Sequence, residues 1–307
     1  MDYGNIEGVT LPVSKLVLGS MVCSTEDLGL TFDLLDAFVM AGGSCIDTAR
    51  IYNGGKSENA VGAWLQERRN RNNIVVLGKG AHHDSSGPRV TPEHITADLN
   101  TSLESMQTDY MDLYVLHRDD PAVPVGPIVE CLNEQQREGK IRAFGGSNWT
   151  PERLQEANDY AAEHKLKPFV VSSPHFSLAI PSGPMWAGCV TLDSAAMSWY
   201  QKHQFPVFAW SSQASGFFTG RYAPDVHTNL DVERIFYSDQ NWERLRRAKE
   251  TGEAHGVSAN TIALAYVLHQ PFPLYALIGP RTLQELNSSM LAIDIKLSAD
   301  ELRYLEV

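Results

Sequence analysis

Cysteine is scarce in this sequence, and the few thiols follow no recognisable pattern. Four cysteines, Cys23, Cys45, Cys131 and Cys189, lie far apart in 307 residues, with no CxxC pair and no histidines at metal-ligand spacing. This excludes the disulfide framework of a small secreted domain and a cysteine-based zinc site. We expect free thiols, mostly buried, and no metal site.

Long apolar runs and a leader segment are also missing. No stretch approaches the ~18 uninterrupted apolar residues that predict a transmembrane helix. The first residues, MDYGNIEGVTLP, have neither the basic start nor the apolar core of a secretory signal. We therefore expect a cytoplasmic protein with no membrane partner.

Positive charge is in deficit. There are 25 Lys and Arg residues against 37 Asp and Glu residues, which gives a formal net charge of -12. Nucleic-acid binding is disfavoured, because it depends on basic side chains that neutralise phosphates. A small-molecule partner is the better expectation, and any anionic ligand must be captured by helix N-termini or a few placed cations. The oligomeric state has no signal in the sequence.

No GxGxxG motif follows the first apolar run, and this absence disfavours a Rossmann fold. What the sequence has instead is a regular alternation of short apolar runs with longer helical segments, which is typical of βα units. The runs are residues 16–19, 44–46, 74–77, 112–116, 143–145, 169–172, 207–209 and 276–278. Their number predicts an α/β fold of the (β/α)8 TIM-barrel class, as a single domain over residues 1–307.

Segments with helical periodicity separate the runs, at residues 26–41, 57–68, 91–106, 125–138, 150–164, 192–203 and 241–255. Two of them begin with Thr-Pro-Glu, at Thr91 and Thr150, which supplies an N-cap oxygen, a proline in the first turn and an acid near the positive helix end. Residues 258–269 and 298–305 predict extra helices near the C-terminus. The longest irregular segments, 82–90, 174–191 and 220–239, follow strands and belong to the active-site face of a barrel.

Four ionisable side chains stand at the ends of successive runs. Asp47 follows the second run, Lys79 follows the third after a kink at Gly78, and His117 follows the fourth, while Tyr52 lies five residues beyond Asp47. Singly, each has an ordinary explanation as a helix cap, a solvated charge, a packing aromatic or a hydrogen-bonded core histidine. Together they predict one site, because the carboxyl ends of barrel strands converge at one mouth.

This set suits the reduction of a carbonyl group. The reaction needs a proton donor for the oxygen, and a phenol becomes a better acid when an adjacent ammonium favours the phenolate. Lys79 can lower the pKa of Tyr52 in this way, Asp47 can hold Lys79 charged, and His117 can donate to the carbonyl oxygen. The hydride must come from a cofactor, because no side chain carries one.

The sequence resembles the aldo-keto reductase family over nearly its whole length. The segments GGSCIDTARIYNGGKSENAVGAWL, VVLGKG, DLYVLHRDD, IRAFGGSNW and FAWSSQASGFFTGR match family motifs in order and spacing. The resemblance implies NADP(H)-dependent reduction of an aldehyde or ketone, which could derive from a sugar, to an alcohol. It also implies that Asp47, Tyr52, Lys79 and His117 are the catalytic tetrad, with Tyr52 as proton donor.

The resemblance further implies a set of cofactor contacts. Ser147 and Asn148 match the residues that hold the nicotinamide carboxamide, and Ser211 and Gln213 match the loop that contacts the pyrophosphate. Gly216 and Gly220 would let the backbone approach the pyrophosphate closely. Gly279, after the last strand, is a further expected cofactor contact.

Several matching positions depart from the common pattern. Ser173 replaces a frequent glutamine, Phe176 replaces a tyrosine that we expect to stack on nicotinamide, and Trp210 replaces a tyrosine after the seventh strand. At the adenosine end Arg281 and Thr282 are candidate phosphate ligands, whereas Glu285 stands where an arginine or glutamine is common. We therefore expect NADPH as cofactor, with NADH possible.

Met21, His82, Trp149 and Trp186 are candidate walls of the substrate pocket, because each lies just beyond a strand. Two other functions fit the same sequence. One is a non-redox lyase or isomerase that uses Lys79 as a Schiff base. The other is a nucleotide-binding regulatory subunit that keeps the barrel.

Overall fold

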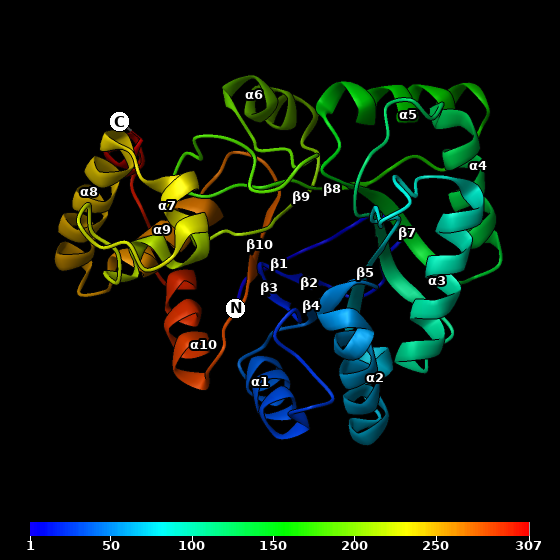
Figure 1. Cartoon of the computed structure of the whole chain (residues 1–307), viewed down its shortest axis with the longest axis horizontal. Helices are drawn as coiled ribbons and strands as arrows, with labels where there is room; N and C mark the ends of the chain where they lie inside the picture. The colour runs from blue at the N-terminus through cyan, green and yellow to red at the C-terminus, as the bar shows by residue number, and fades with distance from the viewer. Residues whose placement is uncertain (307) are drawn as a thin grey trace.

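A closed barrel of eight parallel strands forms the centre of the computed structural model, which describes residues 1–306 (Figure 1). The barrel strands are β3 (Leu16–Gly19), β4 (Cys45–Asp47), β5 (Val75–Gly80), β6 (Met111–Leu116), β7 (Ile141–Ser147), β8 (Val171–Ser173), β9 (Val207–Ala209) and β10 (Leu274–Ile278). They are adjacent in chain order, and β10 closes the barrel against β3. The predicted TIM barrel is confirmed.

Helices surround this barrel, and Figure 1 places α3, α4 and α5 along one side and α8 and α9 along the other. The helices are α1 (Leu28–Met40), α2 (Lys56–Arg68), α3 (Pro92–Met106), α4 (Val125–Arg137), α5 (Pro151–Glu163), α6 (Ser194–His203), α7 (Leu230–Phe236), α8 (Asp239–His255), α9 (Ala259–Leu268), α10 (Leu283–Met290) and α11 (Ala299–Leu305). No helix within residues 1–306 is both long and apolar enough to cross a membrane.

Helix starts follow the local sequence closely. The Thr91 and Thr150 hydroxyls accept from backbone N–H groups in the first turns of α3 and α5, with Pro at the first helical position. The segment 220–239 was expected to be irregular, and this is wrong, because it contains α7. Asn229 caps α7 by accepting from the N–H groups of Asp231 and Val232.

An apolar core fills the barrel interior, separate from the larger core between strands and helices. Phe208 and Tyr275 stack inside it, with ring centroids 4.6 Å apart. A short N-terminal hairpin, β1 (Tyr3–Gly4) and β2 (Val13–Ser14), adds Ile6 and Val13 to the same cluster. This hairpin was not predicted from the sequence, because each of its strands has only two residues.

Gly145 in β7 shows how tightly the barrel strands are packed. A Cβ atom at this position would lie 2.0 Å from the Val171 carbonyl oxygen in the neighbouring strand. Only glycine allows the two backbones to pair at this distance.

Glu58 is a buried acid in the first turn of α2, with none of its surface exposed. Burial raises the pKa of its carboxyl to about 7, and Ser102 and Arg50 oppose only part of that rise. The folded protein therefore binds a proton at this site that the unfolded chain releases near pH 4.5. Stability must fall as the pH rises from the lower value to the higher one.

We predict that Glu58→Gln removes this pH-dependent cost. The free energy of unfolding of the variant, relative to the native protein, should increase by about 1–3 kcal/mol between pH 5 and pH 8. Urea unfolding at the two pH values measures it, with Glu67→Gln, an exposed change on the same helix, as the control. A difference that stays constant with pH would contradict the assignment.

Candidate functional site

The alternation of side chains along the barrel strands places a layer of polar groups at the top of its interior. Cys45, Val75 and Leu77 belong to the interior core, so the residues two positions further on in β4 and β5 face the same way. The corresponding polar or aromatic positions at the carboxyl ends of the strands are Asp47, Lys79, His117, Ser147, Ser173 and Trp210. The barrel therefore brings residues far apart in sequence to one mouth.

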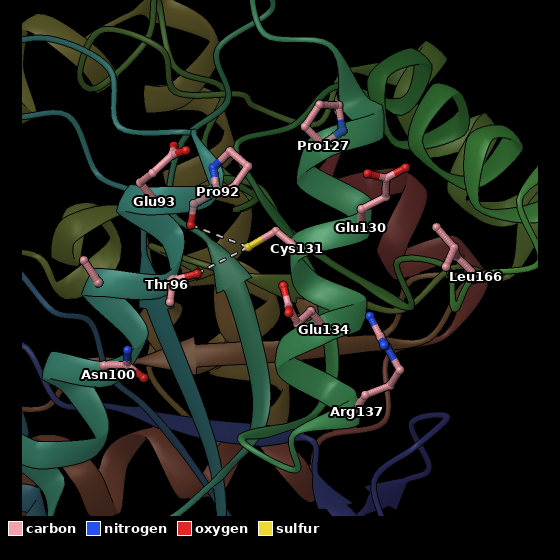
Figure 2. A pocket seen from close by; sticks show the side chains of 11 residues that line it. Pro92, Glu93, Thr96, Asn100, Pro127, Glu130, Cys131, Glu134, Arg137 and Leu166 are labelled. Carbon is pink, nitrogen blue, oxygen red and sulfur yellow. Dashed lines mark hydrogen bonds between the residues drawn. The ribbon is translucent and has the colours of Figure 1, made fainter.

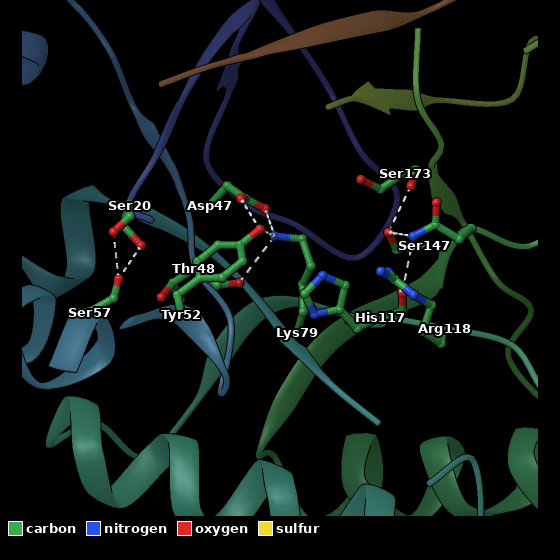
Figure 3. Close-up of polar contacts among 11 residues, drawn as sticks. Ser20, Asp47, Thr48, Tyr52, Ser57, Lys79, His117, Arg118, Ser147 and Ser173 are labelled. Atoms are coloured by element: carbon green, nitrogen blue, oxygen red, sulfur yellow. Dashed lines mark hydrogen bonds and ion pairs between the residues drawn. The ribbon is translucent and has the colours of Figure 1, made fainter. Parts of the chain in front are cut away.

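The structure brings Asp47, Tyr52, Lys79 and His117 together (Figure 3). Asp47 ends β4, and His117 directly follows β6. Tyr52 begins the short 3-10 helix η1 (Tyr52–Gly55). Lys79 lies within β5, which continues to Gly80, so this strand extends three residues beyond its predicted end at residue 77.

Lys79 is the centre of this cluster. Its ammonium forms an ion pair with Asp47, and only 2% of each side chain is exposed. Lys79 Nζ also donates to the Tyr52 hydroxyl oxygen at 3.0 Å and to the Thr48 carbonyl oxygen at 3.3 Å. The Tyr52 hydroxyl lies 3.5 Å from Asp47 Oδ2. One cation thus fixes both the carboxylate and the phenol.

Burial controls the ionisation of these groups. It raises the pKa of Tyr52 above its ordinary value, and the charge of Lys79 opposes part of this rise. Lys79 therefore lowers the Tyr52 pKa as expected, but burial has the larger effect on it. Burial alone would lower the pKa of Lys79, but Asp47 and Tyr52 outweigh it and raise that pKa. The ammonium is charged at neutral pH.

His117 is a neutral imidazole at the edge of the cluster. Burial, followed by the charges of Lys79 and Arg118, holds its pKa well below the ordinary value. Its ring packs edge-on against Tyr52 at 5.8 Å and against His82 at 4.9 Å between centroids. Its Nδ1 atom is buried and has no hydrogen-bond partner within residues 1–306.

Ser147, Asn148 and Ser173 form a connected group beside His117. Ser147 Oγ donates to the Ser173 carbonyl oxygen at 2.8 Å. Asn148 Nδ2 donates to the His117 carbonyl oxygen at 3.1 Å and to Ser147 Oγ at 3.2 Å, and Asn148 Oδ1 accepts from the Val190 N–H. The Ser173 hydroxyl is buried and has no partner among the described residues. The side-chain donors of Ser147 and Asn148 are therefore used in hydrogen bonds within the protein, whereas the Ser173 hydroxyl is available to a ligand.

The loop after β9 contains the predicted pyrophosphate contacts. Ser211, Ser215 and Gly216 have φ values of 50°, 53° and 81°, in the left-handed region. Such turns direct successive N–H groups outward and form concave sites for anions. Gln213 lies in the same loop, and Ser289 of α10 contacts its Oε1 atom at 3.4 Å.

The predicted adenosine end lies at the start of α10. Thr282 caps this helix by accepting from the Glu285 N–H at 3.1 Å, and the Glu285 carboxylate accepts from the Arg281 N–H at 2.7 Å. Arg221, which the sequence analysis missed, lies 3.8 Å from Glu285. Gly279 is exposed, and a Cβ atom there would have no neighbour within 4 Å. The start of α10, the Arg281 backbone and the Arg221 side chain therefore meet at Glu285.

Two aromatic residues are not at the mouth: Trp149, expected in the pocket wall, and Phe176, expected to stack on nicotinamide. Trp149 has no exposed surface, and its Nε1 donates to the Arg118 carbonyl oxygen while its ring packs on Phe169. Phe176 is 4% exposed and stacks on Tyr266 of α9 in the core. Both expectations are wrong, because proximity to a strand end does not determine which way a loop side chain turns.

The remaining predicted wall residues are accessible. Met21 is 60% exposed, and Trp186 is 55% exposed, whereas His82 is half-buried. Trp186 lies 6.0 Å from the half-buried Trp210, measured between ring centroids. These two indoles, from the loop after β8 and the end of β9, form the aromatic side of the mouth.

A separate groove of about 820 Å³ lies between α3 and α4, on the outside of the barrel (Figure 2). Its lining includes Glu93, Glu130 and Glu134, and Cys131 donates within it to the Pro92 carbonyl oxygen. None of the residues predicted for catalysis or cofactor binding lines this groove. Within residues 1–306 there is also no group of three or more His, Cys, Asp or Glu side chains that could hold a metal ion.

Known proteins resemble the chain in sequence and in fold. A sequence model of the aldo/keto reductase family matches residues 15–307. A Bacillus subtilis protein named only as an oxidoreductase is 27% identical, over 99% of this chain and 95% of its own length. A putative aryl-alcohol dehydrogenase of Saccharomyces cerevisiae is 28% identical over 96% of this chain and 82% of its own. Norsolorinic acid reductase of Aspergillus flavus is 27% identical, over 96% and 77%.

A solved structure extends the likeness to the whole fold. The crystal structure of a thermostable aldo-keto reductase superimposes with a TM-score of 0.76, covers 100% of this chain and 99% of the other, and has 22% identity. That likeness concerns the fold, whereas the family match rests on the sequence. The chain belongs to the aldo/keto reductase family of oxidoreductases.

Proposed function

We propose that this protein reduces an aldehyde or ketone to an alcohol with NAD(P)H, and that Tyr52 is the proton donor. The observation that carries the proposal is the buried contact of Lys79 with both Asp47 and the Tyr52 hydroxyl. When bound, the reduced nicotinamide supplies the hydride.

The phenol of Tyr52 gives up its proton as negative charge develops on the carbonyl oxygen. Burial makes the phenolate costly, and the Lys79 ammonium at 3.0 Å offsets that cost in the transition state. Asp47 keeps Lys79 charged and in position. Lys79 and Asp47 therefore act through Tyr52.

His117 is the second group that faces the carbonyl oxygen. Because its pKa is lowered, the imidazole is neutral, and it can donate one N–H without competing as an acid. A neutral donor polarises the carbonyl and leaves the proton transfer to Tyr52. Its packing between Tyr52 and His82 restricts the ring orientation.

The hydrogen-bond inventory supports a place for the nicotinamide carboxamide. The free hydroxyl of Ser173 can donate to the carboxamide oxygen, while Ser147 and Asn148 retain acceptor capacity for its NH2 group. Trp210, which is half-buried at the mouth, is a better candidate to cover the nicotinamide ring than Phe176, which is in the core.

Phosphates would be held on the opposite side of the mouth. The left-handed turn at Ser211 to Gly216 suits the pyrophosphate, and Arg281 with Thr282 at the start of α10 suits the 2′-phosphate of NADPH. Glu285 lies at the same place, which reduces the penalty for NADH. We propose NADPH as the preferred cofactor.

An aromatic carbonyl compound is the substrate class that the mouth fits best. Trp186 and Trp210 offer apolar ring faces, and two similar relatives are named for aryl alcohols and for norsolorinic acid. A Schiff-base mechanism on Lys79 is disfavoured, because its amine is protonated and ion-paired.

We predict that Tyr52→Phe abolishes the proton transfer. The kcat for reduction of benzaldehyde with NADPH should fall by about 10²–10⁴-fold. The Kd for NADPH, measured by quenching of tryptophan fluorescence, should stay within a factor of about three, since the phenol hydroxyl is not among the proposed cofactor contacts. Retention of native kcat in the variant would contradict the role of Tyr52.

We predict a kcat/KM for NADPH at least tenfold above that for NADH, since the Arg281 side chain has no hydrogen bond or ion pair within residues 1–306 and can contact a 2′-phosphate. Arg281→Ala should raise the KM for NADPH about tenfold and leave the KM for NADH nearly unchanged. Arg137→Ala, an exposed change on α4, is the control. A native preference for NADH would remove Arg281 from the cofactor site.

A further inference from the structure

Arg118 is a buried arginine that the proposed reaction does not use. It directly follows His117 and is 8% exposed. Its Nη1 donates to the His117 carbonyl oxygen at 2.9 Å, whereas its Nε is buried without a hydrogen-bond partner in the described part of the chain. Figure 3 shows the side chain beside His117, on the side of Ser147.

No carboxylate of residues 1–306 forms an ion pair with Arg118. Arg153, which is equally buried, pairs with Asp119, and Arg71 pairs with Asp112. Asp119, the acid next to Arg118 in sequence, thus pairs with Arg153 instead. Unlike Arg153 and Arg71, Arg118 has a backbone carbonyl and no carboxylate as its hydrogen-bond partner in the described part of the chain.

The side chains near Arg118 are two histidines and a cysteine, and none of them neutralises its positive charge. Its charge contributes to lowering the pKa of both His82 and His117, after the larger effect of burial. The Cys189 thiol lies within reach of the same charge, and the backbone at Gly188 covers the Arg118 side chain. The guanidinium therefore lies between the loop after β5 and the loop after β8, which are both at the mouth.

A guanidinium cannot lose its proton in a protein, and a buried charge without a counter-ion is unfavourable. A bound anion relieves that cost, and the fork of the guanidinium matches a carboxylate. The overall charge of -12 repels anions, so attraction must come from a local cation such as this one.

We propose that Arg118 recognises a carboxylate carried by the carbonyl substrate, so that the preferred substrates are aromatic aldehydes or ketones with an acidic substituent. This inference rests on the proposed carbonyl reduction. Arg118 would act in substrate recognition, whereas Tyr52 carries the chemistry.

The test compares each of the three formylbenzoates with its own methyl ester, with NADPH as cofactor. The native protein should prefer at least one isomer to its ester by tenfold or more in kcat/KM. Arg118→Met should reduce that preference at least tenfold, and Arg118→Lys should restore part of it. Arg137→Met, which removes an exposed arginine from the outer groove, should leave the preference unchanged.

A binding measurement separates this proposal from the proposed reaction. Benzoate and benzamide are titrated against the protein with NADP+ present, by tryptophan fluorescence. The Kd for benzoate should be at least tenfold lower than that for benzamide, and Arg118→Met should remove the difference while the variant still binds NADP+. If no aldehyde is reduced but benzoate still binds through Arg118, the reaction fails and the anion site stands. If benzoate binds no better than benzamide, or if Arg118→Met leaves the difference intact, the anion site is overturned.

Discussion

The ion pair of Lys79 with Asp47 joins two neighbouring barrel strands at the point where their interior side chains change from apolar to polar. Below it, Cys45, Val75 and Leu77 fill the barrel. Neither charge could be buried there alone, because an isolated ion in such a site is strongly unfavourable. Each partner makes the other possible, and the Tyr52 hydroxyl is held by the pair. The geometry of the phenol therefore depends on the register of β4 against β5, in which Asp47 lies opposite Leu77.

A second network continues from β6 to β8 and stabilises the other half of the mouth. Asn148 connects the backbone of His117 to the loop at Val190, and Ser147 connects β7 to β8. These bonds use the donors of Ser147 and Asn148 for support, which leaves Ser173 as the free hydroxyl of the group. The division between groups that support the site and groups that remain available follows from counting donors and acceptors.

The sequence predicted the barrel and the four-residue cluster well, because both depend on short-range patterns. The alternation of strands and helices and the regular placement of polar residues at strand ends can be read directly from the chain. Loop side chains could not be assigned in the same way. Trp149 and Phe176 were expected at the mouth and lie in the core, since tertiary packing decides their direction. Likewise, Asp119 pairs with Arg153, which is 34 residues away in the sequence, and this contact between distant segments could not be predicted from the sequence.

The N-terminal hairpin has a consequence for biosynthesis on the ribosome. Ile6 and Val13 pack in the same interior cluster as Tyr275 and Leu277, and β3 pairs with β10. This hairpin is translated before the barrel strands, so Ile6 and Val13 find their buried environment only after the last barrel strand has been made. Until then the nascent chain exposes the apolar side chains that later fill the barrel interior next to the N-terminal hairpin. Protection by a chaperone would matter most for these side chains.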